Sequence, residues 1–282
     1  MFDKSAKVDL RPFFDDLSRA RQSALLADYD GTLAAFQSER DRAFPYSGVS
    51  ILLTEILNAG HTRVVIITGR PAQEVVPLLG IEPHPEILGA DGMQRLRCDD
   101  RCELPHLDEG ATQALAQADT LLDEVGLHSR AEHKPGGLAV HWRGLPPDEQ
   151  DDIREIVSRR WLPVADNGHV ELQEFEGGLE MSIPGGNKGD AVRSILKELS
   201  RETSVAYLGD DETDEVAFNA MADRGVRVLV RPEWRETEAD IWLKPPAELL
   251  VFLCEWLAAC RNAQRPPLAA SYSLNRAASR GE

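Results

Sequence analysis

Hydrophobic positions along the chain alternate between short apolar runs and segments with helical spacing. Residues 24–27 and 63–67 form apolar runs that predict buried strands, and residues 48–60 between them carry apolar side chains at helical spacing. The same alternation returns near the C-terminus. Helices are predicted at residues 188–199, 213–222 and 247–259, and strands at 204–208, 226–230 and around 241. This alternation, with almost entirely apolar strands, predicts an α/β fold with a doubly wound parallel sheet.

The pattern changes between about residues 95 and 184. The predicted elements here are helices at 110–126 and 147–160 and paired strands at 128–134 with 138–143 and at 169–175 with 178–183. Helix, hairpin, helix, hairpin is the order of a small α+β domain. We therefore expect a discontinuous main domain of residues 1–94 and 185–262 and an inserted domain of residues 95–184. Residues 263–282 lack periodicity and predict a disordered tail.

Charge narrows the classes of partner. The chain of 282 residues has 48 Asp and Glu against 31 Lys and Arg, a formal net charge of -17. This excess of negative charge disfavours binding to nucleic acid and to anionic membranes. No stretch reaches the roughly 18 uninterrupted apolar residues of a membrane span, and residues 1–10 do not resemble a secretory signal. We expect a folded cytoplasmic protein with no nucleic-acid or membrane partner.

Two carboxylates, Asp28 and Asp30, follow the first predicted strand on a loop. A carboxylate can attack phosphorus as a nucleophile and form an aspartyl-phosphate. A neighbouring carboxyl group can protonate the leaving alcohol and then take a proton from the attacking water. An Asp-x-Asp pair taken alone is also typical of a solvated acidic loop.

Further polar groups follow other predicted strands. The acidic segment 210–215 follows a strand, and carboxylates from two strand ends can hold Mg²⁺, although the same segment also suits an N-capped helix start. Thr68 and Gly69 offer a hydroxyl group and amide donors for a phosphate, and Lys188 places a positive charge at a helix start. Ligands of parallel sheets bind at the carboxyl ends of the strands, so we expect these groups at one site.

Four motifs in this order resemble the haloacid-dehalogenase-like phosphatases, and within them the trehalose-6-phosphate phosphatases. The motifs are Asp28-Tyr29-Asp30-Gly31-Thr32-Leu33, Ile67-Thr68-Gly69-Arg70, Asn187-Lys188-Gly189 and Gly209-Asp210-Asp211-Glu212-Thr213-Asp214-Glu215. The resemblance spans about residues 24–256. It implies a Rossmann-like hydrolase core with an inserted cap, and a phosphatase that converts trehalose 6-phosphate to trehalose and phosphate.

The resemblance also implies roles for individual residues. Asp28 is the implied nucleophile and Asp30 the acid/base, while Thr68, Gly69 and Lys188 bind the phosphoryl group. The implied cofactor is Mg²⁺, held by Asp28, the Asp30 carbonyl and Asp210, with Asp211 and Asp214 in support. A small-molecule sugar phosphate is the implied partner, and a glycosyl-phosphate synthase is the implied metabolic source.

The inserted domain is similar to the cap of this family, which binds the sugar. The expected sugar-binding residues are Gly92, Glu132, Lys134, His141, Arg143 and Glu180. Alternation along a strand puts Glu132 with Lys134, and His141 with Arg143, on one strand face each. A polar binding surface requires this arrangement, and a solvated hairpin face has it too.

Two positions depart from the family pattern. Asp91, in Gly89-Ala90-Asp91-Gly92, stands where the family commonly has histidine, and Glu180-Met181-Ser182-Ile183 lacks the arginine of the family. Both departures fall in the region expected to bind sugar, so three alternatives stay open. They are a phosphatase of another glycosyl phosphate such as glucosylglycerol phosphate, a sugar phosphomutase, and a catalytically silent sugar-phosphate sensor. Retention of Asp28, Asp30, Lys188 and Asp210 together disfavours the sensor.

Overall fold

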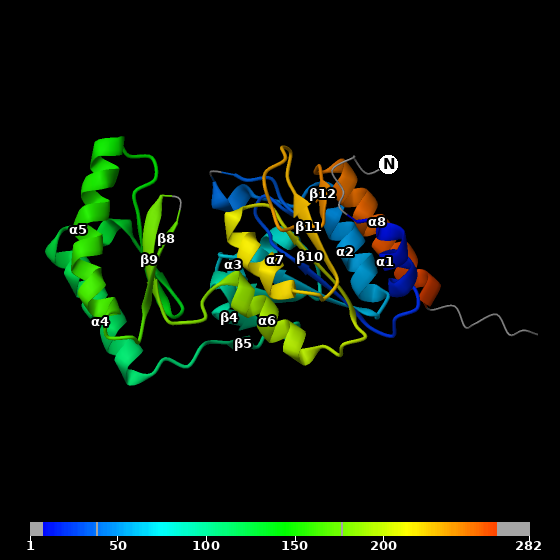
Figure 1. The fold of residues 1–282 in the computed structure, drawn as a ribbon, viewed down its shortest axis with the longest axis horizontal. Coiled ribbons are helices and arrows are strands. Elements are labelled where there is room, and N and C mark those ends of the chain that lie inside the picture. Colours follow the sequence, from blue (N-terminus) through cyan, green and yellow to red (C-terminus); the bar gives the residue numbers. More distant parts are fainter. Residues whose placement is uncertain (1–7, 38, 176, 264–282) are drawn as a thin grey trace, which may run out of the picture.

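The computed structural model describes residues 8–37, 39–175 and 177–263. They form one large and one small sheet, each covered by helices (Figure 1). Ala263, the first residue of the expected tail, is instead the last residue of helix α8 (Ala247–Ala263). The rest of the expected tail, residues 264–282, and the first seven residues lie outside the described residues.

The large sheet confirms the predicted parallel architecture. Its strand order is β12-β11-β10-β1-β2-β3-β4-β5. The strands are β1 (Ser23–Ala27), β2 (Thr62–Ile67), β3 (Glu86–Gly89), β4 (Gln94–Leu96), β5 (Cys102–Glu103), β10 (Ser204–Gly209), β11 (Val226–Val230) and β12 (Ile241–Leu243). The six strands from β12 to β3 run parallel, with β1 between β10 and β2 at the centre. Every residue of β1 is buried, as the apolar sequence of residues 24–27 requires.

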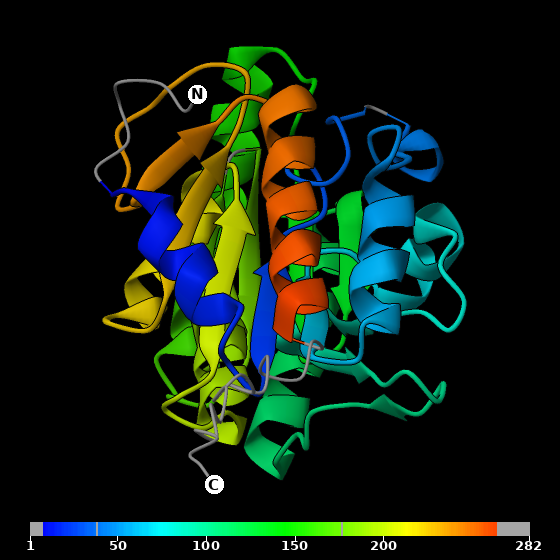
Figure 2. The same ribbon diagram turned by 90° about the vertical axis from the view of Figure 1, so that its right-hand side faces the viewer.

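Helices cover both faces of the large sheet. Helices α1 (Leu10–Leu17), α2 (Val49–Asn58), α3 (Ala72–Leu79) and α8 contribute to one apolar cluster. Helices α6 (Lys188–Glu198) and α7 (Glu215–Met221) contribute to a second cluster on the opposite face. Figure 2 shows α8 between α1 and α2, where its Phe252 and Trp256 are fully buried. Burial of both sheet faces makes this part of the chain a three-layered core.

The small sheet has the order β6-β7-β9-β8 and is antiparallel throughout. Its strands are β6 (Ala131–Lys134), β7 (Gly137–His141), β8 (Glu171–Phe175) and β9 (Gly178–Ser182). Helices α4 (Glu109–Glu124) and α5 (Pro147–Ala165) pack on one face, in an apolar cluster that includes Val140, Met181 and Trp161. In Figure 1 these helices lie on the side away from the large sheet, so the opposite face of the small sheet is directed towards it.

The expected domain limits at 94/95 and 184/185 stay a prediction, but the large sheet reaches beyond the first of them. Strands β4 and β5 continue it to Glu103, since β4 pairs antiparallel with β3 and β5 pairs antiparallel with β4. With three and two residues, they are too short to give a periodic pattern in the sequence. No described helix is long and apolar enough to cross a membrane.

Four single-turn helices complete the described elements: η1 (Arg40–Arg42), η2 (Ala90–Gly92), η3 (His128–Arg130) and η4 (Glu212–Asp214). Three of them lie in loops that follow strands of the large sheet or helices beside it. The loops carrying η2 and η4 directly follow β3 and β10. They therefore lie at the carboxyl edge of the sheet, where a ligand site is expected.

Candidate active site

The carboxyl ends of three adjacent strands bring the predicted groups together. Asp28 follows β1, Thr68 follows β2 and Asp210 follows β10. The parallel register sets Ala27 opposite both Ile66 and Leu208, so the three strands end at the same level. Within the described part of the chain, carboxylate oxygens of Asp28, Asp210 and Asp214 lie within 4.8 Å of one another. The ends of β1 and β10 therefore bring their carboxylates together, and the roles expected of these residues stay predictions.

Asp28 has one occupied and one open carboxylate oxygen. The side chain is buried, and its Oδ1 accepts a hydrogen bond from Lys188 Nζ at 2.8 Å. Its Oδ2 is also buried but accepts no hydrogen bond from the described residues. Burial raises the pKa of Asp28 well above its usual range, with Asp214 and Asp210 adding to the rise and Lys188 opposing it. A buried acceptor without a donor calls for a bound partner such as a cation or phosphorus.

Lys188, the first residue of α6, is held by two carboxylates. Its Nζ donates to Asp28 and, at 2.9 Å, to Asp214 Oδ1, which also accepts from the hydroxyl of Tyr207 at 2.6 Å. Burial disfavours the charged amine, but Asp214 and Asp28 raise the pKa of Lys188 well above its usual value. A fixed positive charge therefore lies beside the open oxygen of Asp28.

Asp214 holds the neighbouring residues of the site in place through hydrogen bonds. Its Oδ2 accepts the backbone N–H groups of Asp210 and Asp211, at 2.8 and 3.2 Å, while Oδ1 is used by Lys188 and Tyr207. Protein donors thus occupy both oxygens, which fits the expected supporting role better than direct binding of a metal. A Cβ at Gly209 would lie 2.4 Å from Asp214 Cγ, so a glycine is needed where this side chain folds over β10.

Asp210 lies against the loop that follows β1. Gly31 has φ +86°, and a Cβ there would lie 2.0 Å from Asp210 Oδ2, so only glycine permits this approach. Asp210 Oδ1 accepts from the Thr32 hydroxyl at 3.3 Å. Burial, followed by repulsion from Asp214 and Asp211, raises the pKa of Asp210 to about 7. Crowded carboxylates with an open oxygen form a donor set that fits a hard divalent cation.

Asp91 lies beside the expected phosphate loop. Thr68 is buried, and its hydroxyl oxygen accepts the N–H of Arg70 at 3.2 Å. A Cβ at Gly69 would lie 3.4 Å from Asp91 Oδ2. Asp91 is held in the left-handed region at φ +54°, and its N–H donates to the Thr68 carbonyl at 2.9 Å. The family departure at this position is therefore next to the groups predicted to bind phosphate, and burial raises the pKa of Asp91.

Two other predicted carboxylates are engaged elsewhere. Asp30 accepts two hydrogen bonds from Arg70, from Nε at 2.5 Å and from Nη2 at 2.6 Å. Asp211 Oδ1 accepts the N–H and the hydroxyl of Thr213 at 2.9 and 2.6 Å, and so caps η4. The helix-cap interpretation of the acidic segment holds for Asp211 and Asp214, which form a capping box, and Asp214 also belongs to the carboxylate cluster. The roles expected for Asp30 and Asp211 stay predictions.

The face of the small sheet away from α4 and α5 is polar. Lys134 Nζ donates to Glu180 Oε2 at 2.6 Å, and His141 Nε2 lies 2.8 Å from Glu132 Oε2. Cross-strand pairing sets Ala139 of β7 opposite both Glu132 and Glu180. The small alanine side chain between the two carboxylates leaves room for a ligand on this face. Strand β7 ends at His141. Arg143 lies beyond the strand end, where it is exposed, and its expected contact with sugar stays a prediction.

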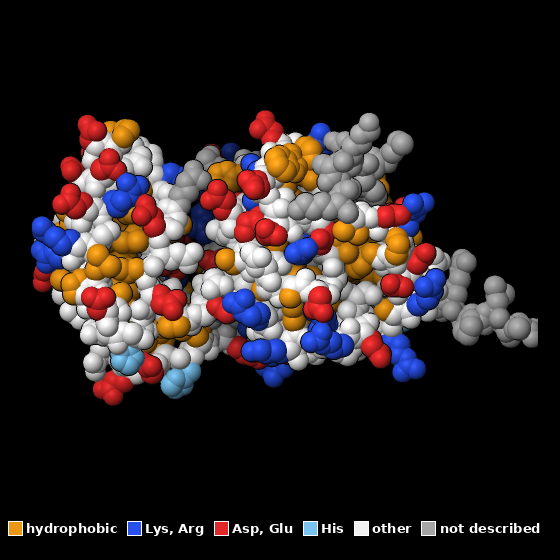
Figure 3. Space-filling view, in the orientation of Figure 1, with side chains coloured by type: hydrophobic (Ala, Val, Ile, Leu, Met, Phe, Trp, Pro, Cys, Tyr) orange, Lys and Arg blue, Asp and Glu red, His pale blue; other side chains and the backbone are white. Residues whose placement is uncertain are grey.

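A cleft separates the polar face from the large sheet (Figure 3). Both Lys134 of the small sheet and Lys188 of α6 lower the pKa of Asp91, against the dominant effect of burial, so both lysines lie within electrostatic range of it. Hydrogen bonding by His141 lowers the pKa of Glu132 to about 2, and Lys134 and Arg40 act in the same direction. The cleft therefore has fixed charges on both walls.

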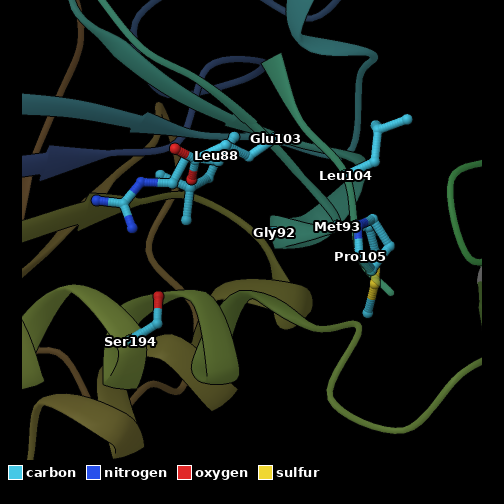
Figure 4. A pocket seen from close by; sticks show the side chains of 8 residues that line it. Leu88, Gly92, Met93, Glu103, Leu104, Pro105 and Ser194 are labelled. Atoms are coloured by element: carbon cyan, nitrogen blue, oxygen red, sulfur yellow. The ribbon is translucent and has the colours of Figure 1, made fainter. Parts of the chain in front are cut away.

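Gly92 lies close to helix α6. A Cβ there would lie 2.8 Å from Ala191 Cβ, so the glycine allows the η2 loop to pack closely on α6. Gly92 also lines a separate hollow of about 230 Å³ with Met93, Leu104 and Ser194 (Figure 4). This hollow contains none of the carboxylates of the acidic site, so it is distinct from it. The expected contact of Gly92 with sugar stays a prediction.

Comparison with known proteins assigns the family. The family model described as trehalose-phosphatase matches residues 26–240, from the first strand to the region before β12. The chain belongs to the trehalose-phosphatase family. The match includes the acidic site and the whole insertion, and it confirms the family suggested by the four motifs.

Individual members of the trehalose-phosphatase family share both sequence and fold with the chain. A trehalose-phosphate phosphatase of Mycobacterium avium is 30% identical over 247 residues, which cover 82% of this chain and 61% of that protein. The probable trehalose-phosphate phosphatase C of Arabidopsis thaliana is 27% identical, with 89% and 84% covered. The chain thus spans about three fifths of the length of its mycobacterial relatives. The trehalose-6-phosphate phosphatase of Aspergillus fumigatus shares its fold, with a TM-score of 0.70, 24% identity, and 89% and 98% covered.

Three residues that hold the site were given no role in it from the sequence. Arg70 binds Asp30, Tyr207 binds Asp214, and Arg235 donates to the carbonyls of Asp210 and Asp211 at 3.2 and 2.5 Å. A polar hydroxyl in an otherwise apolar strand was a usable signal for Tyr207, since buried hydroxyls need partners. Arg235 comes from a loop far along the chain, and its sequence context carries no such signal.

Proposed function

We propose that the chain is a Mg²⁺-dependent phosphatase that hydrolyses trehalose 6-phosphate through an aspartyl-phosphate. The main support is the open Oδ2 of Asp28, which is buried at a strand end between Lys188 and Asp210. A nucleophile needs a free lone pair in a site that stabilises its target, and this oxygen has both. The names of the family members and the polar face across the cleft support the choice of a sugar phosphate.

The proposed reaction has two steps. Asp28 Oδ2 attacks phosphorus, the bond between phosphorus and the sugar oxygen breaks, and Asp30 gives that oxygen a proton. Water then attacks the phosphorus of the aspartyl-phosphate, Asp30 takes up its proton, and Asp28 is released with inorganic phosphate. Thr68, the Gly69 amide and Lys188 bind the phosphoryl oxygens in both steps.

Asp28, Asp210 and the carbonyl of Asp30 are the proposed ligands of Mg²⁺, with Asp211 and Asp214 in support. Once bound, the ion offsets the repulsion between these carboxylates and a phosphate dianion and polarises the phosphoryl group. Oxygen donors suit Mg²⁺, and the chain places them at one strand edge.

The cap face and the cellular setting complete the proposal. Glu132, Lys134, His141 and Glu180 bind hydroxyl groups of the disaccharide, with Gly92 and Arg143 at the edges of the site. A synthase that transfers a glycosyl group to a sugar phosphate supplies the substrate. Both enzymes act in the cytoplasm, because a charged sugar phosphate does not cross a membrane unaided.

A panel of phosphate esters tests the substrate. With Mg²⁺ present, we expect the highest kcat/KM for trehalose 6-phosphate, lower values for glucosylglycerol phosphate and glucose 6-phosphate, and slow release from p-nitrophenyl phosphate. A higher kcat/KM for glucosylglycerol phosphate than for trehalose 6-phosphate would make glucosylglycerol, rather than trehalose, the alcohol that the enzyme releases. Transfer of the phosphoryl group between two sugar hydroxyls would indicate a mutase, and binding without any release would indicate a sensor.

Truncation of the cap pair should separate recognition from chemistry. Lys134→Ala and Glu180→Ala each remove one partner of the 2.6 Å ion pair on the polar face. Because a hydrogen bond to a charged group is worth about 1.5–3 kcal/mol, kcat/KM for trehalose 6-phosphate should fall roughly 10- to 150-fold. Hydrolysis of p-nitrophenyl phosphate, which lacks sugar hydroxyls, should change little.

Glu174→Ala is the matched control for the cap variants. Glu174 is on the opposite face of the same sheet, opposite Leu179, and pairs with Arg154 at an exposed position. Its loss should leave both substrates unaffected. Equal losses on the two substrates in Lys134→Ala or Glu180→Ala would show that the pair supports the fold rather than sugar binding.

A further inference from the structure

Asp30 is held in an arrangement that conflicts with its proposed task. Both of its oxygens accept hydrogen bonds from the guanidinium group of Arg70, which is buried, whereas the Asp30 side chain is 27% exposed. A general acid must carry a proton on one of these two oxygens and direct it at the leaving alcohol. The arginine fork places a donor on each oxygen and so fixes the orientation of the carboxyl group. For Asp30 to turn a proton towards the leaving oxygen, this pairing has to shift or open during turnover.

Arg70 is also anchored at a third point. Its Nη1 donates to the backbone carbonyl of Arg40 at 2.6 Å. Arg40 begins η1, in the segment that follows the Asp30 loop. The guanidinium of Arg70 thus uses Nε and Nη2 for Asp30 and Nη1 for η1. Displacement of the Arg40 backbone would change the position of the group that holds Asp30.

The side chain of Arg40 connects this segment to the cap. Its Nη1 lies 3.3 Å from Glu132 Oε1, and its Nη2 lies 3.7 Å from Glu74 Oε2 on α3. The other oxygen of Glu132 bonds to His141 on the polar face. One guanidinium is therefore shared between a core carboxylate and a cap carboxylate, and a continuous series of contacts links Asp30 to the sugar-facing side of the cap.

We propose that Arg40 is a positioning residue that keeps Asp30 bound to Arg70 until a glycosyl group occupies the cap. This inference rests on the proposed function. Sugar hydroxyls that bind Glu132 compete with Arg40 for the same carboxylate, whereas a small phosphate ester makes no such contact. Loss of the Glu132 contact lets η1 move, which withdraws the Arg40 carbonyl from Arg70 and frees Asp30 to turn towards the leaving oxygen. A substrate shifts the equilibrium between Asp30 bound to Arg70 and Asp30 released from it only if it binds the two states differently. The hydrogen bond from the sugar to Glu132 is that difference.

The coupling makes a prediction that a purely structural role does not make. Arg40→Gln removes the ion pair with Glu132 but keeps the backbone carbonyl, so Asp30 should be released more often without a sugar. The rate with benzyl phosphate, an alcohol ester without sugar hydroxyls, should then rise. An exposed ion pair is worth up to about 1 kcal/mol, so kcat should increase roughly twofold to fivefold. The kcat for trehalose 6-phosphate, which already frees Asp30, should stay the same.

The experiment measures kcat for both esters in the wild type, Arg40→Gln and the control Arg42→Gln. Arg42 is also on η1, but among the described residues its ion pair is a local one with Glu39, at 2.7 Å, and its side chain is 71% exposed. We expect the kcat for trehalose 6-phosphate divided by the kcat for benzyl phosphate to fall in Arg40→Gln and to be unchanged in Arg42→Gln. The increase in the benzyl phosphate rate should vanish when Asp30→Asn is added to Arg40→Gln. An unchanged or increased ratio in Arg40→Gln, equal slowing of both esters, or an increase that survives Asp30→Asn overturns the coupling. No phosphate release from trehalose 6-phosphate by the wild type would instead refute the proposed function.

Discussion

Replacement of Asp28 by asparagine is expected to reduce phosphate release from trehalose 6-phosphate by on the order of 10⁶-fold, the loss seen when a hydrolase loses its nucleophile. The amide has no anionic oxygen to attack phosphorus. The fold should survive, because Lys188 keeps its bond to Asp214 and the substitution removes a buried carboxylate whose raised pKa shows that its charge is disfavoured. Phosphate release and thermal unfolding, measured on the same sample, check both parts.

Asp151→Asn is the control for this change. Asp151 forms an exposed ion pair with Arg154 on α5, far from the strand edge, so the same chemical change there should affect neither activity nor unfolding. Substantial turnover by purified Asp28→Asn would assign the nucleophile to another residue. Loss of the folded state would show that the Asp28 pair with Lys188 is needed for stability.

Removal of Mg²⁺ should have the second-largest effect. Treatment with EDTA is expected to lower phosphate release about 100-fold or more, since a metal at a phosphoryl site is worth several kcal/mol. The physical reason is the crowding of Asp28, Asp210 and Asp214 at one strand edge, where a phosphate dianion would add further negative charge. Addition of excess Mg²⁺ should restore the rate.

Ca²⁺ provides the comparison for the metal test. It prefers more ligands at longer distances than Mg²⁺, so it should restore less activity in the same oxygen donor set. Full activity in EDTA, with no metal detected in the protein by elemental analysis, would contradict the metal assignment. Equal restoration by both ions would show that the site does not select the smaller cation.

The predictable part of the molecule is the part in which local pattern and fold agree. Apolar runs such as residues 24–27 of β1 are buried, and the parallel arrangement then brings Asp28, Thr68 and Asp210 to the same edge. Lys188 was predictable for the same reason, because the start of a helix in such a sheet faces the ligand site. The family match agrees with these inferences.

Contacts between distant segments could not be predicted from local pattern. Nothing around Arg70 in the sequence indicates that its fork is used by Asp30 or that the Arg40 carbonyl takes its third donor. Strands β4 and β5 of the large sheet could not be predicted either, because their few residues show no recognisable period. The end of β7 at His141 also depends on a distant segment, because the backbone N–H groups of Trp142 and Arg143 both donate to the Gly177 carbonyl.

The central claim, that Asp28 attacks the phosphorus of a sugar phosphate, is tested most directly by trapping the intermediate. Wild-type enzyme is mixed with trehalose 6-phosphate and Mg²⁺ and quenched in acid within the first turnover. Peptide mass spectrometry should then find one phosphoryl group, on the peptide that carries Asp28, and none in the Asp28→Asn variant. A phosphoryl group on a different residue, or turnover with no phosphorylated peptide, would contradict the account.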